Sequence, residues 1–358
     1  MELYKNLENL KNLSDAFYSA EQHIKIKGNE YTVKSFTYRL ASYSEFNYDN
    51  AKDSRGTAYY TEKGKDNWKL FCRSYPKFWN LGENIPKEDY MKDNPVIECF
   101  EKLDGSLILV GMIDDKLIAK SKTSLYSDQA ELANKFLDSH AEYRAFCEEM
   151  ISKGKTPVFE GIGRNNVIVL RYDVDFELVL LGVVDNFTGE IQTFKDLPNY
   201  KNIKIAEVYY KDWDELLEIK ENSKPNIEGF VVKSSKGLCK VKVNAYLDLH
   251  SLKDTVNNVK SLASLILDDN LDDLIGSFRD DEATVNYIIE EQEKISKTYN
   301  TLVKTVEDNY KLSKHLNRKE FAIHNQKEFP GIFGLLMSKY LGKEVNYKDF
   351  FMKNKMYE

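Results

Sequence analysis

The sequence has little cysteine and little proline, with four cysteines and seven prolines among 358 residues. The cysteines show no Cys-x-x-Cys spacing, which argues against a disulfide scaffold and against a zinc site; they are Cys72, Cys99, Cys147 and Cys239. No run of 18 apolar residues is present, and the first 30 residues contain no stretch suited to a signal peptide. These absences predict a soluble, cytoplasmic protein without a membrane span, whose cysteines are buried thiols.

The net charge is −7 at neutral pH, so basic residues are not in excess. A field of this sign would repel a polyanion at long range. Enzymes that bind phosphates overcome such repulsion by concentrating lysine and arginine locally. The position of the basic residues, rather than their number, must therefore indicate whether nucleic acid is a partner.

The pattern of residues changes near position 247. Before it, short alternating or apolar runs predict strands at 31–38, 107–113, 116–122, 157–161, 167–172, 176–184, 230–233 and 238–243, and apolar residues at helical spacing predict a helix over 127–153. Beyond it, glycine and proline are rare, and one apolar stripe runs from Val285 to Tyr310. We therefore predict an α+β domain over 1–247 and an all-α domain over 248–358.

The most informative motif is Lys102-Leu103-Asp104-Gly105, which places an amine on a tight turn between two strand-like runs. A lysine in this position can attack the α-phosphate of a nucleotide. The string is weak on its own, since it occurs by chance in about one chain in ten of this length. An ordinary hairpin with a solvated lysine is the alternative.

Two further segments suit phosphate and nucleotide binding. Arg55, next to Gly56, could hold a phosphate through two hydrogen bonds, or could be an exposed loop arginine. The segment from Arg73 to Asn80, which includes Lys77, interleaves two cations with three aromatic residues. Such a surface stacks bases and pairs with phosphates, although a packed aromatic cluster has the same composition.

Two carboxylates and two lysines complete the set. Glu160 and Glu228 are embedded in strand-like runs, where a carboxylate is costly unless it binds a metal, a ribose hydroxyl or a cation. A structural ion pair would also explain them. Lys240 and Lys242 alternate with apolar residues, so both point to one face of a strand. A triphosphate could lie between them, and an edge strand protected by lysines is the alternative.

The order Lys-x-Asp-Gly, embedded Glu, Glu-Gly and Lys-x-Lys resembles that of the covalent nucleotidyltransferase superfamily of ligases and capping enzymes. Tyr38, the stretch from Lys77 to Leu81 and Lys120-Ser121-Lys122 further resemble the RNA ligase 1 family of T-even bacteriophages. The resemblance implies a nucleotidyltransferase domain with ATP-grasp-like antiparallel sheets. Helices follow the lysine pair here, where DNA ligases and capping enzymes generally carry a small β-barrel, which favours RNA ligase 1.

The resemblance implies an ATP-dependent RNA ligase. Lys102 would form a covalent lysyl-AMP, the AMP would pass to an RNA 5′-phosphate, and a 3′-hydroxyl would then displace AMP. Catalysis is assigned to Lys102, Glu228, Lys240 and Lys242. The nucleotide site is assigned to Tyr38, Arg55, Lys77, Lys102, Lys122, Glu160, Lys240 and Lys242. Mg²⁺, with Mn²⁺ as an alternative, is assigned to Glu160 and Asp272, while Asp104 would orient the Lys102 loop and Lys120 would lie near the phosphates.

The implied partner is tRNA broken in the anticodon loop, chosen by residues 248–358. A separate polynucleotide kinase/phosphatase would prepare the ends, and the protein would be a monomer in the cytoplasm of the host. GTP-dependent RNA capping and non-catalytic RNA binding on the same fold are the alternatives. Three positions depart from the family pattern: Leu103 replaces a glutamate, Ser54 replaces a cysteine, and Gly161 stands where a bulky aromatic is expected.

Overall fold

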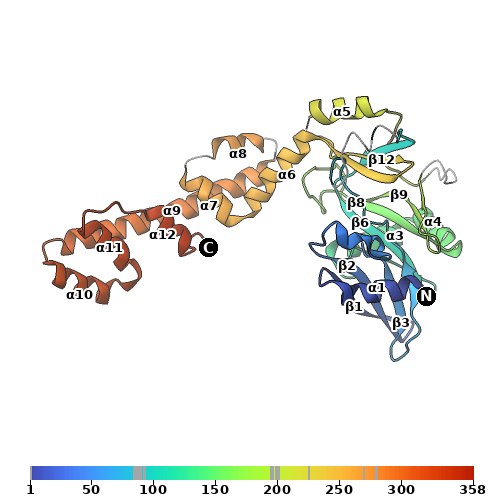
Figure 1. Ribbon diagram of the computed structural model, residues 1–358, viewed down its shortest axis with the longest axis horizontal. Coiled ribbons are helices and arrows are strands. Elements are labelled where there is room, and N and C mark those ends of the chain that lie inside the picture. Colours follow the sequence, from blue (N-terminus) through green and yellow to red (C-terminus); the bar gives the residue numbers. More distant parts are fainter. Residues whose placement is uncertain are drawn as a thin grey trace. The chain divides into compact units, whose positions relative to one another are not determined.

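The chain divides into two compact units, Met1–Leu247 and Asp248–Glu358 (Figure 1). The computed structural model describes residues 2–83, 91, 94–193, 197, 202–224, 226–268, 271–278 and 281–358. The N-terminal unit combines three sheets with helices, whereas the C-terminal unit is built from helices (Figure 1). The predicted fold class, α+β followed by an all-α region, is confirmed.

All pairings between the strands of the N-terminal unit are antiparallel across its described residues. The first sheet has the order β1 (Phe17–Ile26), β2 (Asn29–Tyr38), β3 (Ala58–Glu62) and β4 (Lys69–Cys72). The second has the order β10 (Ile191–Gln192), β9 (Glu177–Asp185), β8 (Lys155–Ile162), β6 (Ser106–Ile113) and β7 (Lys116–Lys120). The third has the order β11 (Val208–Tyr209), β5 (Glu98–Lys102), β12 (Gly229–Ser234) and β13 (Gly237–Lys242).

Helices cover these sheets and form the C-terminal unit. Up to residue 222 the helices are α1 (Glu2–Leu13), the 3₁₀ turns η1 (Ser44–Asn47) and η2 (Ala51–Asp53), α3 (Asp128–Ser139), α4 (Ala141–Ser152) and α5 (Trp213–Asn222). From residue 244 they are α6 (Asn244–Asn257), α7 (Val259–Leu267), α8 (Asp272–Ser277), α9 (Glu282–Ser313), α10 (Arg318–Glu328), η4 (Pro330–Ile332), α11 (Phe333–Tyr340) and α12 (Tyr347–Lys353).

The second sheet forms the centre of the N-terminal unit because both of its faces are covered. Successive side chains of a strand point to opposite faces. Ile108 and Val110 of β6 therefore pack with helices α3 and α4, while Leu109 and Ile113 pack with the first sheet. The four cysteines are free and buried, as predicted.

Two of the predicted elements were wrong. The helix predicted over 127–153 is broken at His140, whose extended backbone separates α3 from α4. The imidazole stacks on Phe136 with ring centroids 3.8 Å apart, and this contact stabilises the corner. Residues 167–172 form a loop instead of a strand, and their backbone serves the site described below.

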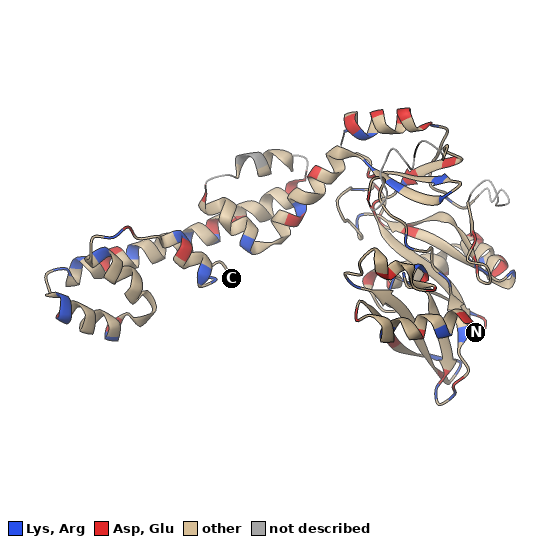
Figure 2. Ribbon diagram, in the orientation of Figure 1, with Lys and Arg blue, Asp and Glu red and all other residues tan. Residues whose placement is uncertain are grey.

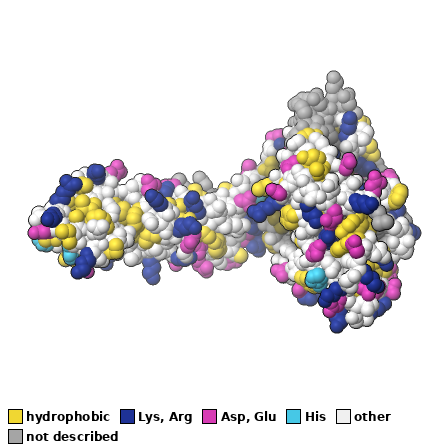
Figure 3. Space-filling model, turned by 60° about the horizontal axis from the view of Figure 1, so that its bottom comes forward, with side chains coloured by type: hydrophobic (Ala, Val, Ile, Leu, Met, Phe, Trp, Pro, Cys, Tyr) yellow, Lys and Arg dark blue, Asp and Glu magenta, His cyan; other side chains and the backbone are white. Residues whose placement is uncertain are grey.

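The C-terminal unit is organised around the long helix α9. Its apolar stripe is buried as predicted at Ile288, Ile295, Leu302 and Val306, whereas Ile289 of the same predicted stripe is 39% exposed. The space-filling view shows hydrophobic side chains on the surface of this unit, interspersed with Lys and Arg (Figure 3). No helix in the described part of the chain is both long and apolar enough to cross a membrane.

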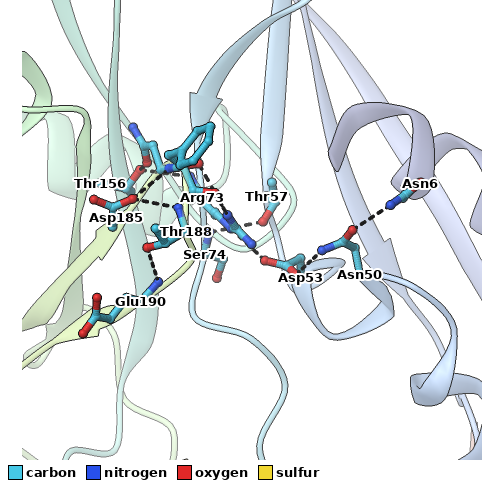
Figure 4. A network of polar contacts seen from close by, with 12 residues as sticks. Asn6, Asn50, Asp53, Thr57, Arg73, Ser74, Thr156, Asp185, Thr188 and Glu190 are labelled. Carbon is cyan, nitrogen blue, oxygen red and sulfur yellow. Dashed lines mark hydrogen bonds and ion pairs between the residues drawn. The ribbon is translucent and has the colours of Figure 1, made fainter. Parts of the chain in front are cut away.

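A buried arginine connects three parts of the N-terminal unit (Figure 4). Arg73 Nε lies 2.8 Å from Asp53 Oδ1, and both side chains are nearly inaccessible to solvent. Arg73 Nη1 donates to the carbonyl oxygen of Phe187 at 3.0 Å, and the Arg73 backbone N donates to Thr156 Oγ1 at 2.9 Å. Arg73 thus joins the loop before Arg55 to the turn after β9 through its guanidinium, and to β8 through its backbone.

Replacing Arg73 with alanine should destabilise the N-terminal unit by about 3–5 kcal/mol, because it leaves the buried Asp53 carboxylate without its partner. Arg144→Ala is the matched control. It removes an exposed ion pair with Asp138 and should cost about 0.2–1 kcal/mol. Urea unfolding followed by tryptophan fluorescence measures both, since Trp68, Trp79 and Trp213 all lie in this unit. Equal losses in the two variants would contradict the role given to Arg73.

Candidate active site

Lys102 lies where two sheets meet. It ends β5 of the third sheet, and β6 of the second sheet begins at Ser106, directly after Asp104-Gly105. The hairpin alternative is therefore wrong, because β5 and β6 do not pair. A cavity of about 200 Å³ opens between the sheets. Its wall includes Arg55, Tyr75, Phe78, Phe100, Lys102, Leu107, Glu160, Leu181, Val231 and Lys240.

Strand register brings the charged residues of the third sheet together. Gly229 on the central strand β12 pairs with Lys102 of β5 on one side and with Lys242 of β13 on the other. Gly229 has φ +142°, and a Cβ there would lie 2.0 Å from the carbonyl oxygen of Val241. Only glycine fits this position, so the preceding Glu228 is placed between the two lysines.

Glu228 bridges these two lysines. Its side chain is only 3% exposed, and its Oε2 lies 2.7 Å from Lys102 Nζ while its Oε1 lies 2.9 Å from Lys242 Nζ. A buried carboxylate is tolerated when cations compensate its charge. The structure thus brings together three of the predicted catalytic residues through two ion pairs.

Lys240 faces the cavity, on the same side of β13 as Lys242. Cys239 and Val241 are buried on the opposite side, as the alternation predicts. Lys240 Nζ lies 4.8 Å from the centre of the Phe78 ring, and the Arg55 guanidinium lies 5.5 Å from the same ring. Burial lowers the pKa of Lys240 to about 7, and the neighbouring cations, Arg55 first among them, contribute to this lowering.

Glu160 enters the cavity from the second sheet. It pairs with Leu107 in the register of β6 and β8, just after the Lys102 turn. Burial raises the pKa of its carboxyl to about 7, and Lys102 opposes this rise while Glu228 adds to it. Gly105 permits the close approach, because a Cβ there would lie 2.4 Å from the carbonyl oxygen of Gly161.

Asp104 fixes the Lys102 turn by hydrogen bonds. Its Oδ2 accepts from the backbone N of Val169 at 2.7 Å and of Leu170 at 2.6 Å, and its Oδ1 accepts from the Tyr246 hydroxyl at 2.8 Å. The Asp104 backbone N donates to the Tyr172 hydroxyl at 2.8 Å. The predicted strand at 167–172 is a loop because its amide groups bind this carboxylate rather than a neighbouring strand.

The two lysines after β6 have different environments. Lys122 Nζ lies 4.5 Å from the centre of the Tyr38 ring, and burial together with Arg55 lowers its pKa. Lys120 is wholly buried, and its Nζ donates to the carbonyl oxygens of Gly56 at 3.0 Å and Lys122 at 2.9 Å. Lys120 therefore supports the backbone beside Arg55 and does not line the cavity.

Two other predicted site residues lie apart from this cavity. Lys77 lines a neighbouring cavity, near enough to Lys240 to lower the pKa of that lysine. Asp272 begins α8 in the C-terminal unit, and its side chain lies outside the described residues. Among the residues that the structure describes, no three His, Cys, Asp or Glu side chains cluster as a metal site.

Several site residues could not be recognised from sequence. Leu103 is buried in a cluster between the second and third sheets, where a charged residue would not fit. At Gly161 a Cβ would lie 2.9 Å from the Phe176 ring, so that aromatic side chain takes the space of a side chain at 161, on the face of β8 opposite Glu160. The ring comes from a position 15 residues later in the chain, and no local pattern signals this replacement.

Comparison with known proteins shows similarity to RNA ligases over most of the chain. Residues 53–247 match the family model described as RNA ligase, and residues 253–356 match the model for the C-terminal domain of T4 RNA ligase 1. Among solved structures, an archaeal ATP-dependent RNA ligase superposes with a TM-score of 0.49 at 11% identity, covering 76% of this chain and 75% of that one.

Two curated relatives are longer than this chain. A protein of Autographa californica nuclear polyhedrosis virus, named as a bifunctional polynucleotide kinase/RNA ligase, is 27% identical over 298 residues, which cover 73% of this chain and 42% of the relative. A protein of Thermovibrio ammonificans, named as an RNA ligase, is 24% identical over 259 residues, which cover 67% of this chain and 64% of the relative. The matched part is thus less than two thirds of either relative.

The low pKa of Lys240 predicts that anions bind more tightly at low pH. Below pH 7 the ammonium form already exists in the free protein, whereas above pH 7 the anion must restore the missing proton. The affinity for inorganic tripolyphosphate should therefore fall about tenfold between pH 6 and pH 8 through Lys240 alone. Isothermal titration calorimetry measures this.

Lys240→Arg provides the control, because arginine stays protonated throughout this range and the titration of the ligand itself is unchanged. The variant should show a flatter dependence of affinity on pH than the parent protein. An identical dependence in both proteins would mean that Lys240 does not titrate near pH 7.

Proposed function

We propose that this chain, which belongs to the RNA ligase family, is an ATP-dependent enzyme that joins a 5′-phosphate to a 3′-hydroxyl of RNA. The observation that carries the proposal is the contact of Lys102 Nζ with Glu228, beside a cavity into which Arg55 and Lys240 also project. An amine nucleophile, a carboxylate and several cations within one cavity suit nucleotidyl transfer. The same arrangement has no use in a protein that merely binds RNA.

In the first step, the lone pair of Lys102 Nζ attacks the α-phosphorus of ATP. A phosphorus–nitrogen bond forms, the bond to the bridging oxygen breaks, and pyrophosphate leaves with that electron pair. Nζ must lose its protons in the process. Glu228 Oε2, at 2.7 Å, accepts a hydrogen bond from Nζ and is in position to receive a proton.

The cations stabilise the charge that accumulates on the phosphate oxygens. Arg55 and Lys240 line the cavity beside Lys102. Lys242 is held near Lys102 because both lysines contact Glu228. Because these groups are held in place before the reaction, their stabilisation of the transition state needs little reorganisation. Lys77 and Lys122 would extend the same cationic surface along the triphosphate, with the Tyr38 ring in contact with Lys122.

A divalent cation fits the donor set of this cavity. Glu160 offers carboxylate oxygens in its wall, and Mg²⁺ is commonly held by one or two carboxylates together with substrate phosphates. The buried Glu160, whose carboxyl has a raised pKa, would ionise beside such a cation. When bound, Mg²⁺ or Mn²⁺ would neutralise charge on the triphosphate. Asp272 remains a second candidate ligand.

The later steps use the same pocket. The 5′-phosphate of an RNA would attack the lysyl-AMP, restoring the Lys102 amine and leaving the AMP on the RNA end. A 3′-hydroxyl would then attack that activated phosphate, forming the phosphodiester bond and releasing AMP. Glu228 would hold the freed Lys102 amine by the hydrogen bond described above.

We further propose that the substrate is tRNA cut in its anticodon loop, and that the C-terminal unit recognises it. The match of residues 253–356 to the C-terminal domain of T4 RNA ligase 1 supports a role for this unit. The name of the viral relative joins a polynucleotide kinase to an RNA ligase. This supports a kinase as the partner that supplies the 5′-phosphate end, and we propose a phosphatase activity beside it for the 3′-hydroxyl end.

Lys102→Ala should abolish formation of an adenylylated protein, because Lys102 contacts the Glu228 carboxylate, whereas Lys240, the other lysine of the cavity wall, forms no ion pair with a described carboxylate. Incubation with ATP labelled at the α-phosphate, followed by denaturing electrophoresis, measures this. Lys116→Ala, which removes an exposed lysine at the turn between β6 and β7, should retain full labelling. Stronger labelling with GTP than with ATP would instead support a capping enzyme, and labelling of Lys102→Ala would refute the assignment.

A nicked anticodon stem-loop should be sealed faster than an unstructured RNA of equal length, if the C-terminal unit recognises tRNA. Both substrates carry 5′-phosphate and 3′-hydroxyl ends, and sealing is followed with ATP and Mg²⁺ over time. Equal rates would retain the ligase assignment and remove the tRNA assignment.

A further inference from the structure

A second, larger cavity lies beside the nucleotide cavity. It has a volume of about 650 Å³, and Phe78 belongs to the walls of both. We call it the Trp79 groove, and its wall includes Tyr43, Lys52, Lys77, Trp79, Gly189 and Lys236. Of the side chains in this wall only Lys77 is assigned to the triphosphate above, so most of this volume has no part in adenylyl transfer.

The Trp79 groove is built directly onto the strand that carries the lysine pair. The backbone N of Lys240 donates to the carbonyl oxygen of Trp79 at 2.9 Å, and the backbone N of Leu81 donates to the carbonyl oxygen of Lys240 at 2.8 Å. Residue 80 consequently forms a β-bridge with Lys240. The segment that forms the groove is thus hydrogen-bonded to a residue that lines the nucleotide cavity. A polymer bound in the groove would therefore lie next to that cavity.

The floor of the groove combines an aromatic surface with cations. Trp79 lies with its ring centre 5.1 Å from Lys52 Nζ and 5.8 Å from Lys77 Nζ. The Tyr43 ring, which is 42% exposed, meets Trp79 edge to face with centroids 5.2 Å apart. Burial lowers the pKa of Lys77, which an anion nearby would reverse.

Lysines outnumber carboxylates along the wall of the groove. Lys52, Lys77, Lys233 and Lys236 contribute to it, against Glu83 and Glu190. The Glu83 Oε2 accepts hydrogen bonds from the backbone N and the side-chain amide of Asn80 at 2.9 and 2.8 Å, which hold this carboxylate in place. In a chain whose acidic and basic residues are otherwise interspersed (Figure 2), this local excess of positive charge suits a polyanion.

Hydrogen bonds fix the turn that forms one wall of the groove. Gly189 and Glu190 lie on the turn after β9. Arg73 holds this turn through the carbonyl of Phe187. The Asp185 side chain also accepts a hydrogen bond from the backbone N of Thr188 at 2.8 Å (Figure 4). A Cβ on Gly189 would lie 2.5 Å from the Arg73 guanidinium, so the turn packs closely on it. The same turn exposes the Phe187 side chain almost completely, at 94%.

We propose that the Trp79 groove binds a single-stranded segment of the RNA substrate next to its reacting end. Bases would stack on Tyr43 and Trp79, and phosphates would pair with the lysines, which is how proteins hold single strands without reading their sequence. The Phe187 ring would extend this stacking surface at the rim. The proposal rests on the proposed ligase function and names where its substrate strand lies.

Tyr43→Ala tests the stacking surface with little risk to folding, because this side chain is not part of a buried core cluster. The affinity of the full chain for a short 5′-phosphorylated, fluorescein-labelled single-stranded RNA is measured by fluorescence anisotropy. Loss of one stacked base should weaken binding about fivefold or more. Tyr210→Ala is the matched control, since Tyr210 is 86% exposed and belongs to the wall of neither cavity.

The lysines are tested through the dependence of affinity on salt. Lys52→Ala and Lys236→Ala should each reduce the slope of log affinity against log salt concentration by about 0.7, the contribution of one phosphate contact in a single strand. Lys116→Ala, an exposed lysine away from the groove, should leave the slope unchanged.

Self-adenylylation with labelled ATP and no RNA separates the two proposals. Tyr43 and Lys52 lie outside the nucleotide cavity, so their variants should label like the parent protein. Normal labelling together with weakened RNA binding in the groove variants alone supports the proposal. Normal labelling together with unchanged RNA binding overturns it and leaves the ligase function intact, whereas absence of labelling in the parent protein overturns the ligase function itself.

Discussion

The buried carboxylate of Glu228 is the constraint on which the site depends. It contacts Lys102 on one side and Lys242 on the other, and these two lysines belong to strands that do not pair with each other. Burial of an unpaired carboxylate costs several kcal/mol, so the two ammonium groups and the carboxylate stabilise one another only when all three strands are in register. The close contact at Gly229 fixes that register, because a Cβ would collide with the neighbouring strand.

This register also explains why the site lies between two sheets. The chain leaves the third sheet at Lys102 and enters the second at Ser106, so the nucleophile lies at the crossing, close enough to Glu160 and Glu228 to interact with both charges. Asp104 fixes the crossing by accepting two backbone hydrogen bonds from a loop and one from Tyr246. Positioning of the nucleophile therefore depends on segments more than 60 residues away in the chain.

Features that depend on the local alternation of side chains could be predicted from the sequence. Features that depend on contacts between distant segments could not. The common face of Lys240 and Lys242 follows from the period of a strand, and so does the burial of Cys239 and Val241. The apolar run at 167–172 has the composition of a strand, but its amides bind Asp104. Lys120 and Lys122 look equivalent in the sequence, yet only the fold shows that the first is buried against the carbonyl of Gly56. The segment from Arg73 to Asn80 indicated a surface of aromatic residues and cations, but the other residues of the Trp79 groove come from distant segments and, like the position of Phe176, have no local signal.

Position, rather than basicity, selects the nucleophile. Lys240 has a pKa of about 7, but Lys102 is the lysine held by Glu228 at the crossing between the sheets. The most direct test is to incubate the protein with ATP and Mg²⁺, digest it, and map the AMP-bearing peptide by tandem mass spectrometry. AMP on Lys102 alone is the predicted result, and AMP on Lys240 or on any other lysine would contradict the account.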